Sequence, residues 1–144
     1  MWLAGDGRDA ISATRRRWGS RMGLRKVNVA EGFSQISDYW DPRVAGDIND
    51  MQVRFVKISG AFHWHHHETE DELFFVVQGR LRMHLRDGVI DLEPNEFLVV
   101  PHGTEHLPEA LTEECHLILL EPGTTLNTGT VENERTVRMP GRLA

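Results

Sequence analysis

Residues 63–79 read HWHHHETEDELFFVVQG, and a second window at residues 99–106 reads VVPHGTEH. Six of the eight histidines of the chain fall within these two short windows. Side chains of an extended strand repeat every two residues, so His65 and His67 are predicted to face the same side, with His63 in the same phase. Neighbouring imidazoles on one strand face can bind a single cation, so the first window predicts a metal site in a β structure.

The acidic residue that closes the first window supports the same interpretation. Glu72 stands directly before the apolar run 73–77, where a carboxylate is costly to bury unless it is paired or bound to a metal. A hairpin through residues 68–71 would bring it beside the two histidines. In the second window, His106 follows a turn marked by Pro101 and Gly103, and it is a candidate for a fourth ligand.

The sequence around the two windows alternates short apolar runs with turn residues, a pattern typical of an all-β sandwich or barrel. Asp87–Gly88 is the strongest hairpin signal, and a type I′ turn with positive φ at both residues is predicted there. Residues 32–50 are rich in Ser, Asp, Gly, Pro and Asn and are predicted to form a loop or arm. The expected strands lie in or around residues 51–55, 73–77, 81–85, 97–100 and 117–120.

With its spacing taken into account, the first window resembles the first motif of the cupin superfamily. That motif runs Gly, five residues, His-x-His, three or four residues, Glu, six residues, Gly. Here His65, His67, Glu72 and Gly79 stand at matching positions, and Gly60 stands one residue closer than usual.

The second window resembles the second cupin motif, which runs Gly, five residues, Pro-x-Gly, two residues, His, three residues, Asn. Pro101, Gly103 and His106 match it, whereas Asn95 replaces the Gly and Ala110 replaces the Asn. Neither departing position is a metal ligand in the family. Asn tolerates left-handed backbone well, so Asn95 is expected to serve the same turn.

The resemblance covers roughly residues 50–121 and implies a double-stranded β-helix, the jelly-roll barrel of the cupins. It implies one divalent metal ion per chain (Fe, Mn, Zn, Ni or Co) with His65, His67, Glu72 and His106 as ligands. It is strongest to small single-domain cupins described as mannose-6-phosphate-isomerase-like, a label that reports fold and not activity. The implied function is dioxygenase- or isomerase-like Lewis-acid chemistry on a small, anionic, oxygen-chelating molecule. The alternative is a non-catalytic module that binds or senses a sugar or organic acid.

Catalytic groups beyond the ligands are sparse in the sequence. His63 and Glu70 are the candidates for proton transfer, by strand phase and by proximity. The alternatives are a pocket-lining role for His63 and a plain loop charge for Glu70. His66 and His102 are expected to face solvent. Arg residues at 54, 80 and 82 could bind a substrate anion if they face inward, and the alternative is exposed strand charges.

The organisation expected from the sequence is a basic N-terminal extension at 1–24, the barrel at 25–123 and a polar tail at 124–144, with Met22 as an alternative start. Residues 1–26 carry a net charge of +5 and the remaining residues −11. An acidic body disfavours nucleic-acid binding. No apolar run approaches the roughly 20 residues that cross a bilayer, and Cys115 is the sole cysteine. These features predict a cytoplasmic protein with neither a nucleic-acid nor a membrane partner.

A homodimer is also expected. Residues 73–77 are apolar in both strand phases, so one face packs inside the barrel and the other needs separate cover. A second sheet or a partner subunit would supply that cover, with the arm before Met51 or the tail contributing a strand.

Overall fold

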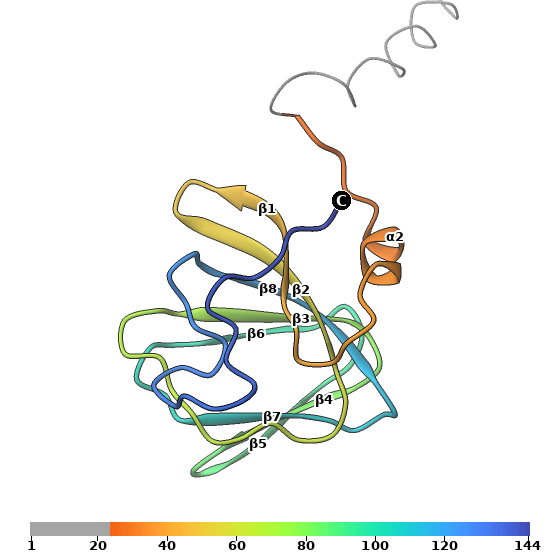
Figure 1. Cartoon of the computed structure of the whole chain (residues 1–144). Coiled ribbons are helices and arrows are strands. Elements are labelled where there is room, and N and C mark those ends of the chain that lie inside the picture. The colour runs from red at the N-terminus through yellow and green to blue at the C-terminus, as the bar shows by residue number, and fades with distance from the viewer. Residues whose placement is uncertain (1–23) are drawn as a thin grey trace, which may run out of the picture.

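Two antiparallel β-sheets face each other in the computed structural model of the chain, which describes residues 24–144 (Figure 1). The basic extension predicted for residues 1–24 lies, apart from Leu24, outside the described residues, as does Met22. No helix within residues 24–144 is long and apolar enough to span a bilayer. The elements are α2 (Val29–Ser34), β1 (Arg43–Ile48), β2 (Met51–Ile58), β3 (Glu72–Gln78), β4 (Leu81–Leu85), β5 (Gly88–Leu92), β6 (Phe97–Val100), β7 (His106–Ala110) and β8 (Cys115–Pro122).

The strand order confirms the predicted all-β jelly-roll barrel. One sheet has the order β1-β2-β8-β3-β6 and the other the order β5-β4-β7. In β3 the buried residues alternate with half-buried ones, so Glu72, Phe74 and Val76 point between the sheets. The main core fills this space with apolar side chains from both sheets, among them Val56, Ile58, Phe74, Val76, Leu81, Met83, Leu92, Val100, Leu117 and Leu119.

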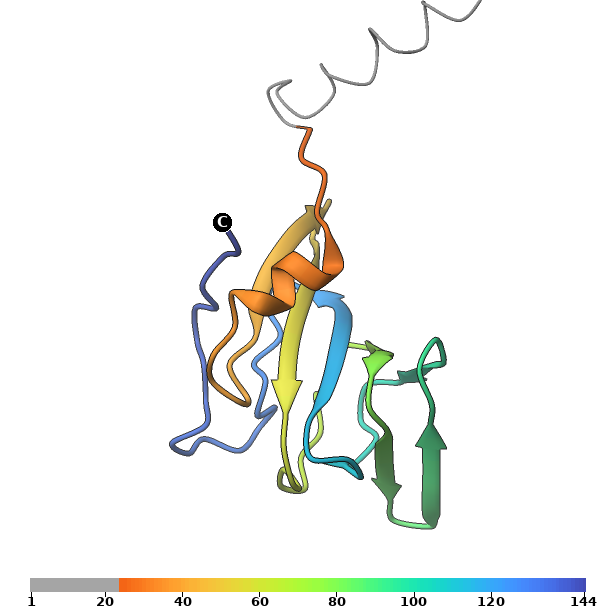
Figure 2. The same cartoon turned by 90° about the vertical axis from the view of Figure 1, so that its right-hand side faces the viewer.

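The short helix α2 is a departure from the loop predicted over residues 32–50. Asn28 caps it, because its side chain accepts a hydrogen bond from the Glu31 backbone N–H at 3.0 Å. The ring of Phe33 stacks on Phe55 at 4.7 Å and on His116 at 4.8 Å. The helix therefore covers the outer face of β2 and β8 (Figure 2). A helix of six residues is too short to show an apolar periodicity in the sequence, so it was not predicted. The packing of Phe33 on Phe55 and His116 stabilises it.

The second departure in the same stretch is β1. It pairs antiparallel with β2 of the same chain, with an irregularity between Val44 and Gly46. The chain turns between the two strands at Asn49, whose φ is 54°. The segment was predicted as a loop or arm because residues 32–50 are rich in Ser, Asp, Gly, Pro and Asn. The neighbouring strand supplies hydrogen bonds that local composition does not reveal.

The turns were predicted with mixed success. The hairpin at β4–β5 is present, but Leu85 pairs with Gly88, so the turn residues are Arg86 and Asp87 and neither has a positive φ. The predicted type I′ turn at Asp87–Gly88 is therefore wrong. Asn95, in contrast, has a φ of 70° and occupies the left-handed conformation expected of it.

The segment 124–144 forms neither a helix nor a strand of its own, yet it is firmly packed. Figure 1 shows it running back across the barrel toward β1. The N–H of Val44 donates to the carbonyl of Gly141 at 2.8 Å, and its carbonyl accepts from the N–H of Leu143 at 3.0 Å; the Leu143 side chain is buried. Gly129 lies so close to the His66 carbonyl that a Cβ would come within 2.1 Å of the oxygen. The tail therefore packs directly against the first histidine window.

Candidate metal centre

The two histidine windows are joined directly by backbone hydrogen bonds. The N–H of His65 donates to the carbonyl of His106 at 3.1 Å, and the N–H of His106 donates back at 2.9 Å. His65 and His67 lie in the connection between β2 and β3, and His106 is the first residue of β7. This bridge brings together residues about forty positions apart in the sequence.

Three of the predicted ligand residues converge inside the barrel. One ring nitrogen from each of His65, His67 and His106 lies within 4.8 Å of the others. All three side chains are buried, with exposed fractions of 4%, 4% and 0%. A buried cluster of imidazoles has the spacing to share one cation.

Two backbone carbonyls orient two of these three rings, those of His65 and His106. The Nδ1 atom of His65 lies 3.0 Å from the His63 carbonyl oxygen, and the Nδ1 of His106 lies 2.8 Å from that of Thr104. A carbonyl oxygen only accepts, so both Nδ1 atoms donate and the Nε2 atoms keep their lone pairs. The Nε2 atoms of His67 and His106 are buried without a hydrogen-bond partner. Such a carbonyl contact is the usual support of a metal-binding imidazole.

Burial keeps the three imidazoles neutral. Together with the proximity of His106, it lowers the pKa of His65 to about 3 and that of His67 to about 4. The pKa of His106 is also lowered, mainly by burial. The rings are therefore unprotonated at neutral pH and available as electron-pair donors.

Glu72 lies beside this cluster at the start of β3. Its carboxylate oxygens lie 3.4 Å from the Nε2 of His67 and 3.9 Å from the Nε2 of His106. Burial raises the pKa of Glu72 well above its usual range, and the adjacent carboxyl of Glu121 raises it further. A buried carboxyl in contact with ring nitrogens has the donor chemistry to complete a mixed nitrogen and oxygen site.

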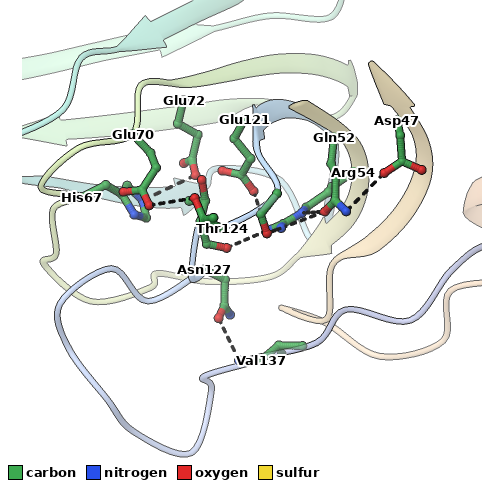
Figure 3. A network of polar contacts seen from close by, with 12 residues as sticks. Asp47, Gln52, Arg54, His67, Glu70, Glu72, Glu121, Thr124, Asn127 and Val137 are labelled. Carbon is green, nitrogen blue, oxygen red and sulfur yellow. Dashed lines mark hydrogen bonds and ion pairs between the residues drawn. The ribbon is translucent and has the colours of Figure 1, made fainter. Parts of the chain in front are cut away.

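Behind Glu72 lies an ion pair that the sequence analysis missed (Figure 3). The Nη1 of Arg54 donates to Glu121 at 3.0 Å, and both side chains are 1% exposed. Its remaining N–H groups donate to the Gln52 side chain and to the carbonyls of Gly123 and Thr125. Strand phase was the available signal, since Arg54 and Glu121 share the inward phase of the apolar residues in β2 and β8.

The two other predicted site residues, His63 and Glu70, lie near different histidines of the cluster. The His63 ring packs on Phe62 with centroids 4.1 Å apart and lies 5.4 Å from the His65 ring, and burial lowers its pKa. The buried Nε2 of His63 has no hydrogen-bond partner. Glu70 accepts a hydrogen bond from Thr124 at 3.3 Å and shares a shallow hollow with His67.

The remaining charged residues considered from sequence are placed at the surface or in surface pairs. His102 is exposed and bonds to Asp71 at 2.8 Å, whereas His66 is half-buried and not fully solvent-facing. Arg80 pairs with Glu93 at 2.7 Å and Arg82 pairs with Asp91 at 2.8 Å, both at the exposed surface. Of the three arginines that could have met a substrate anion, only Arg54 faces inward.

Comparison with known proteins places the sequence of this chain in a family. Residues 53–122 match the family described as "Cupin domain". Over 72 residues the chain is 39% identical to "Uncharacterized protein YdbB" of Bacillus subtilis (strain 168), which covers 49% of this chain and 64% of that protein. The chain thus spans less than two thirds of the length of this relative.

Two solved structures extend the match to most of the barrel. A cupin-2 domain containing protein from Shewanella frigidimarina is 42% identical with a TM-score of 0.65, and the match covers 67% of this chain and 93% of that one. Protein NMB1881 from Neisseria meningitidis is 28% identical with a TM-score of 0.63, covering 69% and 100%. With the fold, the histidine cluster and these similarities in agreement, the chain belongs to the cupin superfamily.

Proposed function

We propose that this chain is a metal-dependent cupin that binds one divalent cation through His65, His67 and His106, with Glu72 as the oxygen donor, and acts there on a small organic molecule. The observation that carries the proposal is the convergence of three neutral imidazoles, of which His67 and His106 have a buried Nε2 without a hydrogen-bond partner and His65 and His106 have an Nδ1 bound to a backbone carbonyl. Buried polar atoms without partners are rare, and here they gather at one point.

The donor set fits a divalent transition metal. Mixed imidazole and carboxylate ligands suit Fe, Mn, Zn, Ni or Co. The affinities of such a site follow the Irving–Williams order of divalent ions, so the ligand types do not select one of these metals. Bound at this point, such an ion would supply a Lewis acid with open positions for the oxygen atoms of a ligand. The ligand that best suits a site of residual positive charge is an anionic oxygen chelator.

The chain's own residues would hold and shield this centre. The carbonyls of His63 and Thr104 fix the rings of His65 and His106, and Glu72, whose raised pKa favours the protonated form in the metal-free chain, would add a negative charge once a cation displaces its proton. Arg54 balances the charge of Glu121, so that a second buried carboxylate does not stand unpaired behind Glu72. The apolar residues of both sheets exclude water from the other sides.

Two classes of activity remain to be separated by experiment. Dioxygenase- or isomerase-like turnover is the first, and the half-buried His63 is the group nearest the cluster that could move a proton. Its lowered pKa keeps it neutral and able to accept one. Metal-dependent binding of a small molecule without turnover is the second, and the hydrogen bond from Thr124 to Glu70 favours it, because that contact occupies the Glu70 carboxylate.

Purified, metal-loaded chain is expected to contain about one divalent ion per molecule in elemental analysis. With Fe(II) bound, an oxygen electrode would then follow O₂ consumption with diketones, keto acids and catechols. Uptake of O₂ would assign a dioxygenase, whereas ligand-induced thermal stabilisation without turnover would assign a binding module. Chain that stays metal-free after incubation with each of the candidate ions contradicts the proposal.

We also propose that the partner of this chain is a second copy of itself, docked on the outer face of β3 and β6. Phe97 and Val99 of β6 are 62% and 47% exposed, and they pair across the strands with Phe75 and Leu73. Helix α2 covers the outer face over β2 and β8 and extends to Val77 near the end of β3, which leaves Phe97 and Val99 exposed. Face-to-face packing of two copies about a two-fold axis would bring the Phe97 and Val99 side chains of both copies together and cover both apolar faces at once.

The Phe97→Asp variant is expected to shift the chain from dimer to monomer, because it places a charge at the centre of this apolar face. Light scattering coupled to size-exclusion chromatography measures the change. Ile48→Asp is the matched control, since Ile48 is 54% exposed on β1 at the opposite edge of the same sheet. A wild-type chain that is monomeric at micromolar concentration would contradict the dimer.

A further inference from the structure

A hollow of about 470 Å³ lies on the outside of the barrel, between helix α2 and the outer face of the larger sheet. Figure 2 shows the helix crossing the strands on this side. One wall is formed by α2 and the floor by β2, β3 and β8, and the lining residues are Val29, Ala30, Phe33, Ser34, Lys57, Val77, Gln78 and His116. Neither the proposed metal function nor the proposed dimer uses this hollow.

Fixed contacts hold the hollow in shape. The ring of Phe33 stacks on His116 at 4.8 Å, which joins the wall to the floor. The Nε2 of His116 donates to one oxygen of Glu114 at 2.9 Å, and the other oxygen accepts from the Tyr39 hydroxyl at 2.9 Å. These two hydrogen bonds lower the pKa of Glu114, so its carboxylate is ionised and accepts both. The hollow is therefore formed before any ligand arrives.

Part of the lining is apolar and open to solvent. Val29, Ala30 and Phe33 come from α2, and Val29 is 37% exposed. The pairing of β3 with β8 shifts register between Val76 and Gln78, and such an irregularity lets the neighbours Val77 and Gln78 both reach the hollow. Covering this apolar surface with the body of a ligand is favourable.

The floor carries a row of polar groups beside the apolar wall. Lys57 pairs with His116 across β2 and β8, and His116 pairs with Gln78 across β8 and β3. Lys57 is the one Lys or Arg among the lining residues in the described part of the chain. Its charge lowers the pKa of Glu114, but both oxygens of that carboxylate are bonded to His116 and Tyr39. The Lys57 ammonium is in no ion pair with another residue of 24–144, and a ligand anion can meet it.

We infer that this hollow is a second binding site, for a small organic acid that has one carboxylate and an apolar chain. Lys57 binds the carboxylate, and the Gln78 amide and the Ser34 hydroxyl are hydrogen-bond donors in the same lining. The apolar chain lies against Val29 and Val77. The volume is in the range of small-molecule sites in proteins.

This site is separate from the metal centre. Cys115 and Leu117, the neighbours of His116 in β8, belong to the core between the sheets, and so do Val56 and Ile58, the neighbours of Lys57 in β2. Successive side chains of a strand point to opposite faces, so the hollow and the histidine cluster lie on opposite faces of the sheet. The inference therefore does not depend on the proposed metal function.

Three probes separate the contributions of charge and chain. Heptanoate carries both features, acetate has the carboxylate without the chain, and heptylamine has the chain with the opposite charge. Isothermal titration of the full chain is expected to show heptanoate binding at least about 10-fold more tightly than acetate, because its longer chain covers apolar surface. Heptylamine is expected to bind more weakly than heptanoate, because Lys57 repels its ammonium group. Acetate also reports any carboxylate binding at the metal centre.

A variant of the floor locates the binding. Lys57→Met keeps an apolar side chain and removes the ammonium group, so heptanoate affinity is expected to fall at least about threefold. Zn(II) affinity of this variant is expected to equal that of the wild type. Lys26→Met is the matched control, because Lys26 is the other lysine of the chain, is exposed and does not line the hollow. Its heptanoate affinity should be unchanged.

Several results would overturn the second site. Heptanoate that binds no better than acetate or heptylamine removes the case for an anionic head with an apolar chain. Heptanoate binding that Lys57→Met leaves intact places the ligand elsewhere. If heptanoate does not bind and Lys57→Met instead shifts the chain to monomer in light scattering, the hollow is an interface between two copies. Each of these results leaves the metal function standing.

Discussion

Replacement of His106 by alanine is expected to lower the affinity of the chain for a divalent cation by at least about 10-fold, since loss of a direct ligand should cost no less than loss of a supporting contact. The imidazole of His106 is fully buried, and its Nε2 has no partner other than the cluster itself. Its backbone also bridges to His65. Because alanine keeps that backbone bridge, the loss reports on the ring and not on the docking of the two windows.

Titration of the metal-free protein with Zn(II) or Co(II), followed by calorimetry, measures the effect. His102→Ala is the matched control, because His102 lies four residues earlier in the same window, is exposed and bonds to Asp71. Its affinity for the cation is expected to equal that of the wild type. If His106→Ala retained stoichiometric, equally tight binding, the cluster would be a structural group of histidines and not a metal site.

Replacement of Arg54 by methionine is expected to destabilise the fold by about 3–5 kcal/mol, the usual cost of removing one partner of a buried ion pair. Glu121 would be left in the barrel without its counter-ion, and the Gln52 side chain and the carbonyls of Gly123 and Thr125 would each lose a donor. Urea unfolding of the metal-free chain measures the loss as a change in the free energy of unfolding.

Two further variants show that the loss comes from burial of an unpaired charge. Arg82→Met breaks the exposed pair with Asp91 and is expected to leave the stability nearly unchanged, because solvent screens that pair. The double variant Arg54→Met with Glu121→Leu removes both charges and is expected to recover most of the stability. A double variant as unstable as Arg54→Met alone would show that packing, and not charge, accounts for the loss.

Much of the barrel could be predicted because its signals are local. The alternation in β2 and β4 and the apolar run of β3 depend on side chains pointing to opposite faces of a strand, which neighbouring residues reveal. Asn95 adopts the left-handed backbone expected from its residue type. The turn at Arg86–Asp87 was placed one residue too late, because register, and not the Asp-Gly pair, decides where a hairpin turns.

Elements whose stability depends on partners outside their own residues escaped prediction. α2 is held by stacking on Phe55 and His116, and β1 by hydrogen bonds to β2. The tail has few apolar residues and was predicted only as a polar extension. It packs through backbone hydrogen bonds to Val44 and the close approach of Gly129 to the first window. None of these contacts has a counterpart in the composition of the segments themselves.

The sequence by itself determined the all-β class and the two windows that carry the histidines, because residue type and spacing along a strand decide which side chains share a face. Only the tertiary structure decided that three imidazoles meet inside the barrel and that Arg54 points inward to Glu121. These features are assembled from segments distant in sequence. Their energies come from burial and pairing, which exist only once the sheets have closed on each other.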